Sequence, residues 1–170
     1  GANFLLNVPP DNTGRIHQND VKALRGFGEI LKTVFHKNFV SGAAIVASNV
    51  RASSRQFRPE LMLDGNKASY WSTDDGITNP SVTFQLAAES TFNVLDIREA
   101  IQLGQRIEEF AVDAMIGGNW QEIAHATSIG NRRLIPLSSS CTTRQVRLRV
   151  VKSPVCVAIS EFGLYFDPGL

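Results

Sequence analysis

Apolar residues recur at every second position in several short runs after residue 41, and this spacing constrains the fold more than any other feature of the chain. In one run, Val82, Phe84 and Leu86 alternate with polar residues. Further runs of this kind cover residues 95–97, 110–116, 146–150 and 157–159. Successive side chains of a strand point to opposite faces, so each run predicts a strand with one buried face. Turn-forming clusters separate the runs and no helical spacing appears, so we predict a mainly β chain folded as an antiparallel β-sandwich.

The first forty residues have a different pattern. The apolar run 4–8 ends at Pro9 and predicts one buried strand, and residues 11–14 have the composition of a turn. A helix is predicted next, with Asn19 or Asp20 as its N-cap. Its apolar positions recur at steps of three and four residues: Val21, Leu24, Phe27, Leu31 and Val34. One short βα segment cannot bury both faces of its strand, so we expect it to belong to a larger domain.

Composition and charge limit the class of protein. The chain has 170 residues, and 43% of them are hydrophobic, which is enough to form a core. Lys and Arg number 17 against 16 Asp and Glu, and this balance argues against a nucleic-acid-binding protein. No apolar run approaches the roughly 20 residues that a membrane span needs, so no membrane partner is expected. The chain lacks an initial Met and a signal-peptide pattern, so we expect a mature or excised segment.

The two cysteines, Cys141 and Cys156, cannot form a four-ligand metal site by themselves. Both stand in apolar surroundings typical of strands. Two interpretations remain open: a pair of buried free thiols, or a disulfide, which would require an oxidising compartment.

The sequence offers no catalytic constellation. His17, His36 and His125 are scattered and lack the spacing of a zinc site. The adjacent carboxylates Glu108 and Glu109 would point to opposite faces of a strand, which argues against an acid–base pair. We therefore assign no catalytic residue to this chain.

One segment is more specific. Residues 63–73, LDGNKASYWST, place Asp64, Asn66 and Ser69 on one tight turn. Shorter motifs stand at fitting distances from it: Ala52-Ser53-Ser54, Gly104-Gln105-Arg106-Ile107, Gly118-Asn119-Trp120 and Glu161-Phe162-Gly163-Leu164-Tyr165. From about Val40 to Tyr165 the chain resembles discoidin-type domains and carbohydrate-binding modules of the galactose-binding-like fold. That resemblance implies a galactose-binding-like jelly roll with Trp71 and Trp120 in its core.

Many members of that fold hold a structural calcium ion. The ligands that the resemblance implies are the side chains of Asp64, Ser69 and Glu161 and the backbone carbonyls of Leu61, Asn66 and Ser160. Calcium takes six to eight oxygen ligands and accepts mixed carboxylates, hydroxyls and carbonyls, so this set is chemically suitable. The alternative is that Asp64 only caps its turn while Glu161 pairs with an arginine.

The resemblance also implies a carbohydrate site at the loop end of the sandwich. Ser72 occupies the position of a sugar-binding His, Arg98 matches an Arg, and Leu103 stands where an Asn is usual. Because Ser72 and Leu103 replace the usual His and Asn, the pattern argues against galactose as the ligand and leaves other glycans open. The candidate carbohydrate-binding residues are Ser72, Asp74, Asp75, Arg98 and Gln102.

Residues 1–16, GANFLLNVPPDNTGRI, and 24–31, LRGFGEIL, form a second pattern. They resemble the end of the catalytic barrel in α-L-fucosidases of glycoside hydrolase family 29, where the last strand and helix of a (β/α)8-like barrel occur. Plant members continue directly into a galactose-binding-like sandwich. The resemblance implies that residues 1–38 end such a barrel and that residues 39–170 form the sandwich.

The function implied is therefore that of the C-terminal region of an enzyme that hydrolyses terminal fucose from glycans. The retaining mechanism of that family uses an Asp nucleophile and a separate acid/base, both of which would lie upstream. Glycans and the enzyme's own barrel are the implied partners, and the implied localisation is secreted or extracellular. The alternative is a stand-alone carbohydrate or cell-surface binding module of the discoidin type.

Overall fold

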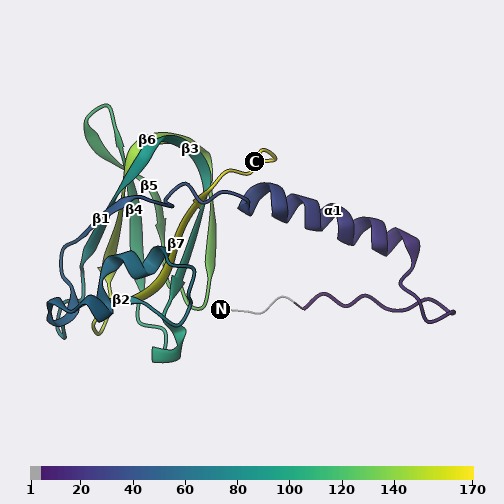
Figure 1. Ribbon diagram of the computed structural model, residues 1–170, viewed down its shortest axis with the longest axis horizontal. Helices are drawn as coiled ribbons and strands as arrows, with labels where there is room; N and C mark the ends of the chain where they lie inside the picture. The colour runs from purple at the N-terminus through teal and green to yellow at the C-terminus, as the bar shows by residue number, and fades with distance from the viewer. Residues whose placement is uncertain (1–4) are drawn as a thin grey trace. The chain divides into compact units, whose positions relative to one another are not determined.

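The computed structural model describes residues 5–170 (Figure 1). The chain divides into two compact units, one ending at Lys37 and the other spanning Asn38–Leu170.

The first unit contains the helix α1 (Gln18–Phe35), as its apolar spacing predicts. The predicted N-cap is wrong: His17 caps the helix by accepting a hydrogen bond from the backbone N–H of Asn19. The predicted turn forms around the carboxylate of Asp11, which accepts from Thr13 and Arg15.

The predicted strand at 4–8 is wrong over its described part. Phe4 lies outside the described residues, whereas residues 5–8 have no strand structure and Leu5 is 91% exposed. A strand is stable only when neighbouring strands satisfy its backbone and cover its side chains, and the described chain supplies none here.

The second unit is the predicted antiparallel β-sandwich, which confirms the fold class. Its strands are β1 (Ala44–Ala47), β2 (Trp71–Ser72), β3 (Ser81–Glu99), β4 (Glu109–Ile116), β5 (Asn119–Ala126), β6 (Arg133–Lys152) and β7 (Ala158–Tyr165). The strands are paired in the order β2-β7-β3-β6-β4-β5, and β1 pairs with β3.

Two long strands join the layers of the sandwich. Residues 81–85 of β3 pair with 145–149 of β6, and after a register shift residues 90–97 pair with 133–143. Figure 1 shows β3 and β6 bending together over one end of the molecule. The loops that follow β3 and β6 therefore meet at the opposite end, together with the loop after β1.

The core contains the apolar positions that the alternation predicts. Val82, Phe84 and Leu86 are buried, and Phe84 stacks on Phe162 with ring centroids 4.3 Å apart. Trp71 is fully buried, as expected. Trp120 is not in the core, contrary to expectation: it is half-buried and packs against the Arg147 guanidinium, 4.5 Å from its ring centroid.

Four short 3₁₀ helices were not predicted: η1 (Arg51–Ser53), η2 (Arg55–Phe57), η3 (Pro59–Leu63) and η4 (Ile101–Leu103). They are too short to show helical periodicity in a sequence. η1, η2 and η3 shape the loop between β1 and β2.

The two cysteines are free and buried, which confirms the free-thiol interpretation. Within residues 5–170, no helix is long and apolar enough to cross a membrane.

Candidate functional site

The predicted calcium loop is a tight turn that begins where η3 ends. One carboxylate oxygen of Asp64 accepts from the backbone N–H of Asn66 at 2.8 Å, and the other accepts from the hydroxyl of Ser69 at 2.6 Å. The same hydroxyl lies 2.8 Å from the carbonyl of Asn66. Asp64, Ser69 and the Asn66 carbonyl therefore converge, as the prediction requires.

Glu161 lies on β7, next to this loop. Burial raises the pKa of its carboxyl, and the neighbouring charge of Asp64 raises that pKa further, against the opposing effects of Arg98 and Lys67. Its Oε1 is buried and has no hydrogen-bond partner among the described residues. The negative charges of Asp64 and Glu161 thus oppose each other, and one acceptor oxygen of Glu161 is unused, an arrangement that a cation would stabilise.

The remaining predicted ligands belong to the elements that pack here. Leu61 is part of η3, which packs against β7, and Ser160 precedes Glu161 on β7. Among the described residues, no group of three or more His, Cys, Asp or Glu side chains is placed to hold a metal ion, so a metal here would also need hydroxyl and carbonyl oxygens. Calcium accepts such ligands more readily than zinc does. Whether calcium binds stays a prediction.

Two of the candidate sugar residues hold the β1–β2 loop in place. The carboxylate of Asp74 accepts from the backbone N–H of Ala52 at 2.7 Å and from Asn49 Nδ2 at 2.9 Å, and these hydrogen bonds lower its pKa. Asp75 pairs with Arg51 at 2.7 Å, and that contact lowers the pKa of Asp75. Both carboxylates already have partners within the protein.

The other candidates are more dispersed. Ser72 is buried, and its hydroxyl donates to the carbonyl of Val157 at 2.8 Å. The amide of Gln102 is 3.5 Å from the carbonyl of Ala68, beside the calcium loop. Arg98 lies on the outer face of β3, next to Asp96. Their role in sugar binding stays a prediction.

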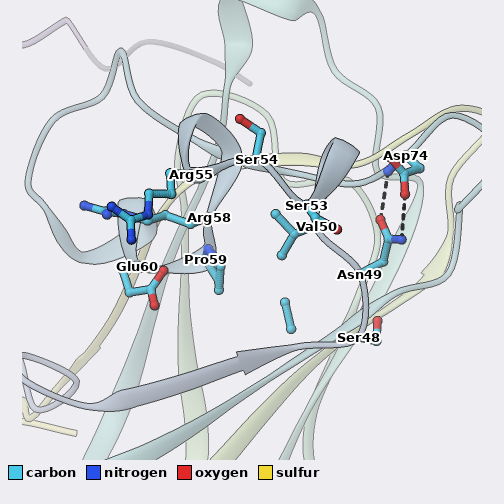
Figure 2. Close-up of a pocket in the computed structure, with 11 residues that line it drawn as sticks. Ser48, Asn49, Val50, Ser53, Ser54, Arg55, Arg58, Pro59, Glu60 and Asp74 are labelled. Atoms are coloured by element: carbon cyan, nitrogen blue, oxygen red, sulfur yellow. Dashed lines mark hydrogen bonds between the residues drawn. The ribbon is translucent and has the colours of Figure 1, made fainter.

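The structure contains a groove of about 790 Å³ that the sequence did not predict. It lies between the end of β1 and the 3₁₀ helices, and only Asp74 of the predicted sugar residues lines it. The lining residues are Ala47, Ser48, Asn49, Val50, Ser53, Ser54, Arg55, Arg58, Pro59, Glu60 and Asp74. Figure 2 shows Arg55, Arg58 and Glu60 at one end, and Asn49 with Asp74 at the other. The motif Ala52-Ser53-Ser54 marks this loop in the sequence, but its groove depends on the folded path.

A network of charged side chains covers the outer face of β4, β5 and β6. Asp113 accepts from both Arg147 and Arg149, and Arg149 also pairs with Glu122. Burial raises the pKa of Asp113, but the hydrogen bonds from the two arginines outweigh it and hold that pKa below its usual value. Both arginines of this network thus pair within the protein, which is typical of a structural surface.

Comparison with known proteins relates both units to fucosidases. The chain is 38% identical to "Putative alpha-L-fucosidase 1" of Oryza sativa subsp. japonica over 166 residues, which is 96% of this chain and 32% of that protein. It is 34% identical to "Alpha-L-fucosidase 1" of Arabidopsis thaliana over 167 residues, or 96% of this chain and 33% of that protein. The chain thus spans about a third of the length of these curated relatives.

A solved structure gives the same result for the fold. The "putative alpha-L-fucosidase from Bacteroides thetaiotaomicron" superposes with a TM-score of 0.89 at 33% identity, covering 98% of this chain and 37% of that one. The F5/8 type C domain family matches residues 44–162, which are most of the sandwich. With its antiparallel jelly roll and the discoidin-like turn at Asp64, this chain belongs to the F5/8 type C domain family.

Proposed function

We propose that this chain is the C-terminal region of an α-L-fucosidase, and that its sandwich is a non-catalytic, carbohydrate-binding accessory domain. The observation that carries the proposal is that similarity to fucosidases extends over 96% of the chain and includes the helix as well as the sandwich. An independent binding module would need only the sandwich to be similar.

The helix α1 supports the proposal. Phe27, Ile30 and Leu31 are each at least 41% exposed, although they occupy the apolar positions of an amphipathic helix. Apolar side chains on such a helix are normally covered by a neighbouring element. The rest of a catalytic barrel, in the two thirds of the relatives' length that this chain does not span, would supply that cover.

A chimera tests this role. This chain would replace the matching C-terminal region of the Arabidopsis relative, and the chimera would be assayed for fucose release from an aryl fucoside. We expect the chimera to be active and this chain alone to be inactive, because the nucleophile and the acid/base lie outside it. Fucose release by this chain alone, or a folded but inactive chimera, would contradict the proposal.

The accessory domain is proposed to contain one structural calcium ion, held by Asp64, Ser69 and Glu161 with the carbonyls of Leu61, Asn66 and Ser160. Support comes from the buried, unpartnered oxygen of Glu161 beside a second carboxylate. When bound, the ion would neutralise the two carboxylates and link the loop to β7.

Calorimetry and thermal melting of the chelated chain test the calcium proposal. At a calcium concentration of 100 times Kd, we expect Tm to rise by about 5–10 °C. Glu161→Gln should abolish the rise, whereas Glu89→Gln, at an exposed carboxylate of β3, should retain it. If the unmodified chain shows no heat of binding and no change in Tm, the calcium proposal is contradicted.

Secretion is proposed with the fucosidase role and is tested separately, by locating the tagged full-length gene product in its native cells. Retention of that product inside the cells would contradict secretion and leave the enzymatic role intact.

A further inference from the structure

We infer that the groove between the end of β1 and the 3₁₀ helices η2 and η3 binds a saccharide carrying a carboxylate, such as a uronic acid. The inference rests on the proposed carbohydrate-binding role and assigns it to a particular site and sugar class. The groove shares only Asp74 with the residues that the sequence predicts for sugar binding.

Two arginines at one end of the groove supply the anion site. Arg55 and Arg58 are exposed, and neither guanidinium group makes a hydrogen bond or ion pair with any residue in 5–170. Figure 2 shows both side chains at the same end of the groove. Two neighbouring guanidinium groups repel each other, so an anion between them is favoured. The planar fork of arginine matches the two oxygens of a carboxylate.

The rest of the lining suits a sugar ring. Val50 and Pro59 lie between the two ends in Figure 2. Val50 is half-buried and offers an apolar surface to the C–H face of a ring, and the largely buried Pro59 lines the groove beside it. Ser48 and Ser54 use their oxygens to accept backbone N–H groups, of Ser81 and Gln56 respectively, and their hydroxyl protons remain able to donate.

The carboxylate of Glu60 disfavours ligands whose negative charges lie close together. It stands at the arginine end of the groove and makes no ion pair with Arg55 or Arg58 within 4.0 Å. A negative charge there disfavours a polyphosphate or a nucleic acid, but it can accept hydrogen bonds from sugar hydroxyls. A saccharide with one carboxylate and several hydroxyls on each ring therefore matches the arginines, the Glu60 carboxylate and the serine hydroxyls of the groove best.

Hydrogen bonds fix the far end of the groove. Asn49 and Asp74 exchange hydrogen bonds, with the backbone N–H of Asp74 donating to Asn49 Oδ1 at 2.8 Å. The indole N–H of the buried Trp71 donates to the carbonyl of Asn49 at 3.0 Å. Ala52 and Ser53 adopt positive φ angles of 51° and 50°, which this network holds in place. A loop fixed before binding loses little entropy when a ligand arrives.

Binding of trigalacturonate and of its methyl ester to the whole chain, measured by calorimetry, tests the inference. The ester keeps the ring and removes the charge. We expect the acid to bind at least fivefold more tightly than the ester. Raising the salt concentration should weaken binding of the acid and leave binding of the ester unchanged.

The variant R55Q/R58Q should weaken binding of the acid at least tenfold and change binding of the ester less than twofold. R144Q, at an exposed arginine of β6 outside this groove, is the matched control and should bind both ligands as the unmodified chain does. R58K keeps the charge without the fork and should bind the acid with intermediate affinity. Melting curves confirm that each variant is folded.

Equal binding of acid and ester, an unchanged affinity in R55Q/R58Q, or an equal loss in R144Q would overturn the inference. Binding of the ester without preference for the acid would leave the carbohydrate-binding role standing. A chain that binds neither ligand, nor any sugar on a glycan array, would contradict that role as well.

Discussion

Glu161 differs from the other described carboxylates in having a buried oxygen without a hydrogen-bond partner. Burial and Asp64 raise its pKa, so the folded chain holds its proton to higher pH than the unfolded chain does. In the absence of metal, this group stabilises the fold at acidic pH and the contribution is lost as pH rises through the raised pKa.

The pH dependence of the chelated chain checks this point. We expect Glu161→Gln to melt at a higher temperature than the unmodified chain at pH 7 in chelator, because it removes a poorly solvated charge. The melting temperatures of the variant and the unmodified chain should converge below about pH 4, where the glutamate of the unmodified chain is protonated whether folded or unfolded. A variant that is less stable than the unmodified chain at pH 7 without metal would show that Glu161 has a partner there.

Asp113 is the opposite case, because two arginines stabilise its charge. Asp113→Ala would leave Arg147 and Arg149 without their shared acceptor in a partly buried position. We expect a loss of about 2 kcal/mol in the free energy of unfolding. The depressed pKa of Asp113 means that its contribution is lost as pH falls through that pKa, so the variant and the unmodified chain should converge in acid. Urea unfolding at pH 7 measures the loss in stability, and a series from pH 7 down to about pH 2 measures the convergence.

Local sequence predicted part of the candidate site. The turn at Asp64 was visible because its contacts fall within six residues. Glu161 lies far from Asp64 in sequence, so only the family resemblance brought the two together. Arg55 and Arg58 gave no signal, since exposed arginines become a binding site only through the path of the loop. Trp120 was misplaced because the family resemblance implied a core position, whereas its side chain is half-buried and packs against the Arg147 guanidinium.

The strands were the most predictable elements, since burial of one face imposes a two-residue period. The lengths of β3 and β6 were not predictable. The alternation stops at segments such as residues 87–91, AAEST, whereas the strand continues there and only its register shifts. The 3₁₀ helices and the absence of a strand at 5–8 depend on contacts beyond the local sequence.

The β4–β5 hairpin has a pH-sensitive contact on its outer face. His125 lies 2.6 Å from Glu109 and 3.2 Å from Glu122, and hydrogen bonds to these two carboxylates raise the pKa of His125. This stabilisation is complete below the usual pKa of histidine and is lost as pH rises through the raised value. We expect His125→Gln to reduce the fall in Tm between pH 6 and pH 8. An identical fall in the variant would show that this contact adds nothing to stability.

The proposed role of the whole chain requires that its two units belong to one longer enzyme. The helix has apolar positions that remain exposed, the sandwich belongs to the F5/8 type C domain family, and the relatives that match both are fucosidases about three times as long. None of these observations requires catalysis by the chain itself.

Capture of the native protein tests that claim most directly. An antibody raised against residues 39–170 would recover the antigen from its source, and its mass and its release of fucose from an aryl fucoside would be measured. If the chain is part of a longer fucosidase, the antigen is a polypeptide about three times the mass of this chain and releases fucose. An antigen with the 18.6 kDa mass of this chain and no fucosidase activity would contradict it.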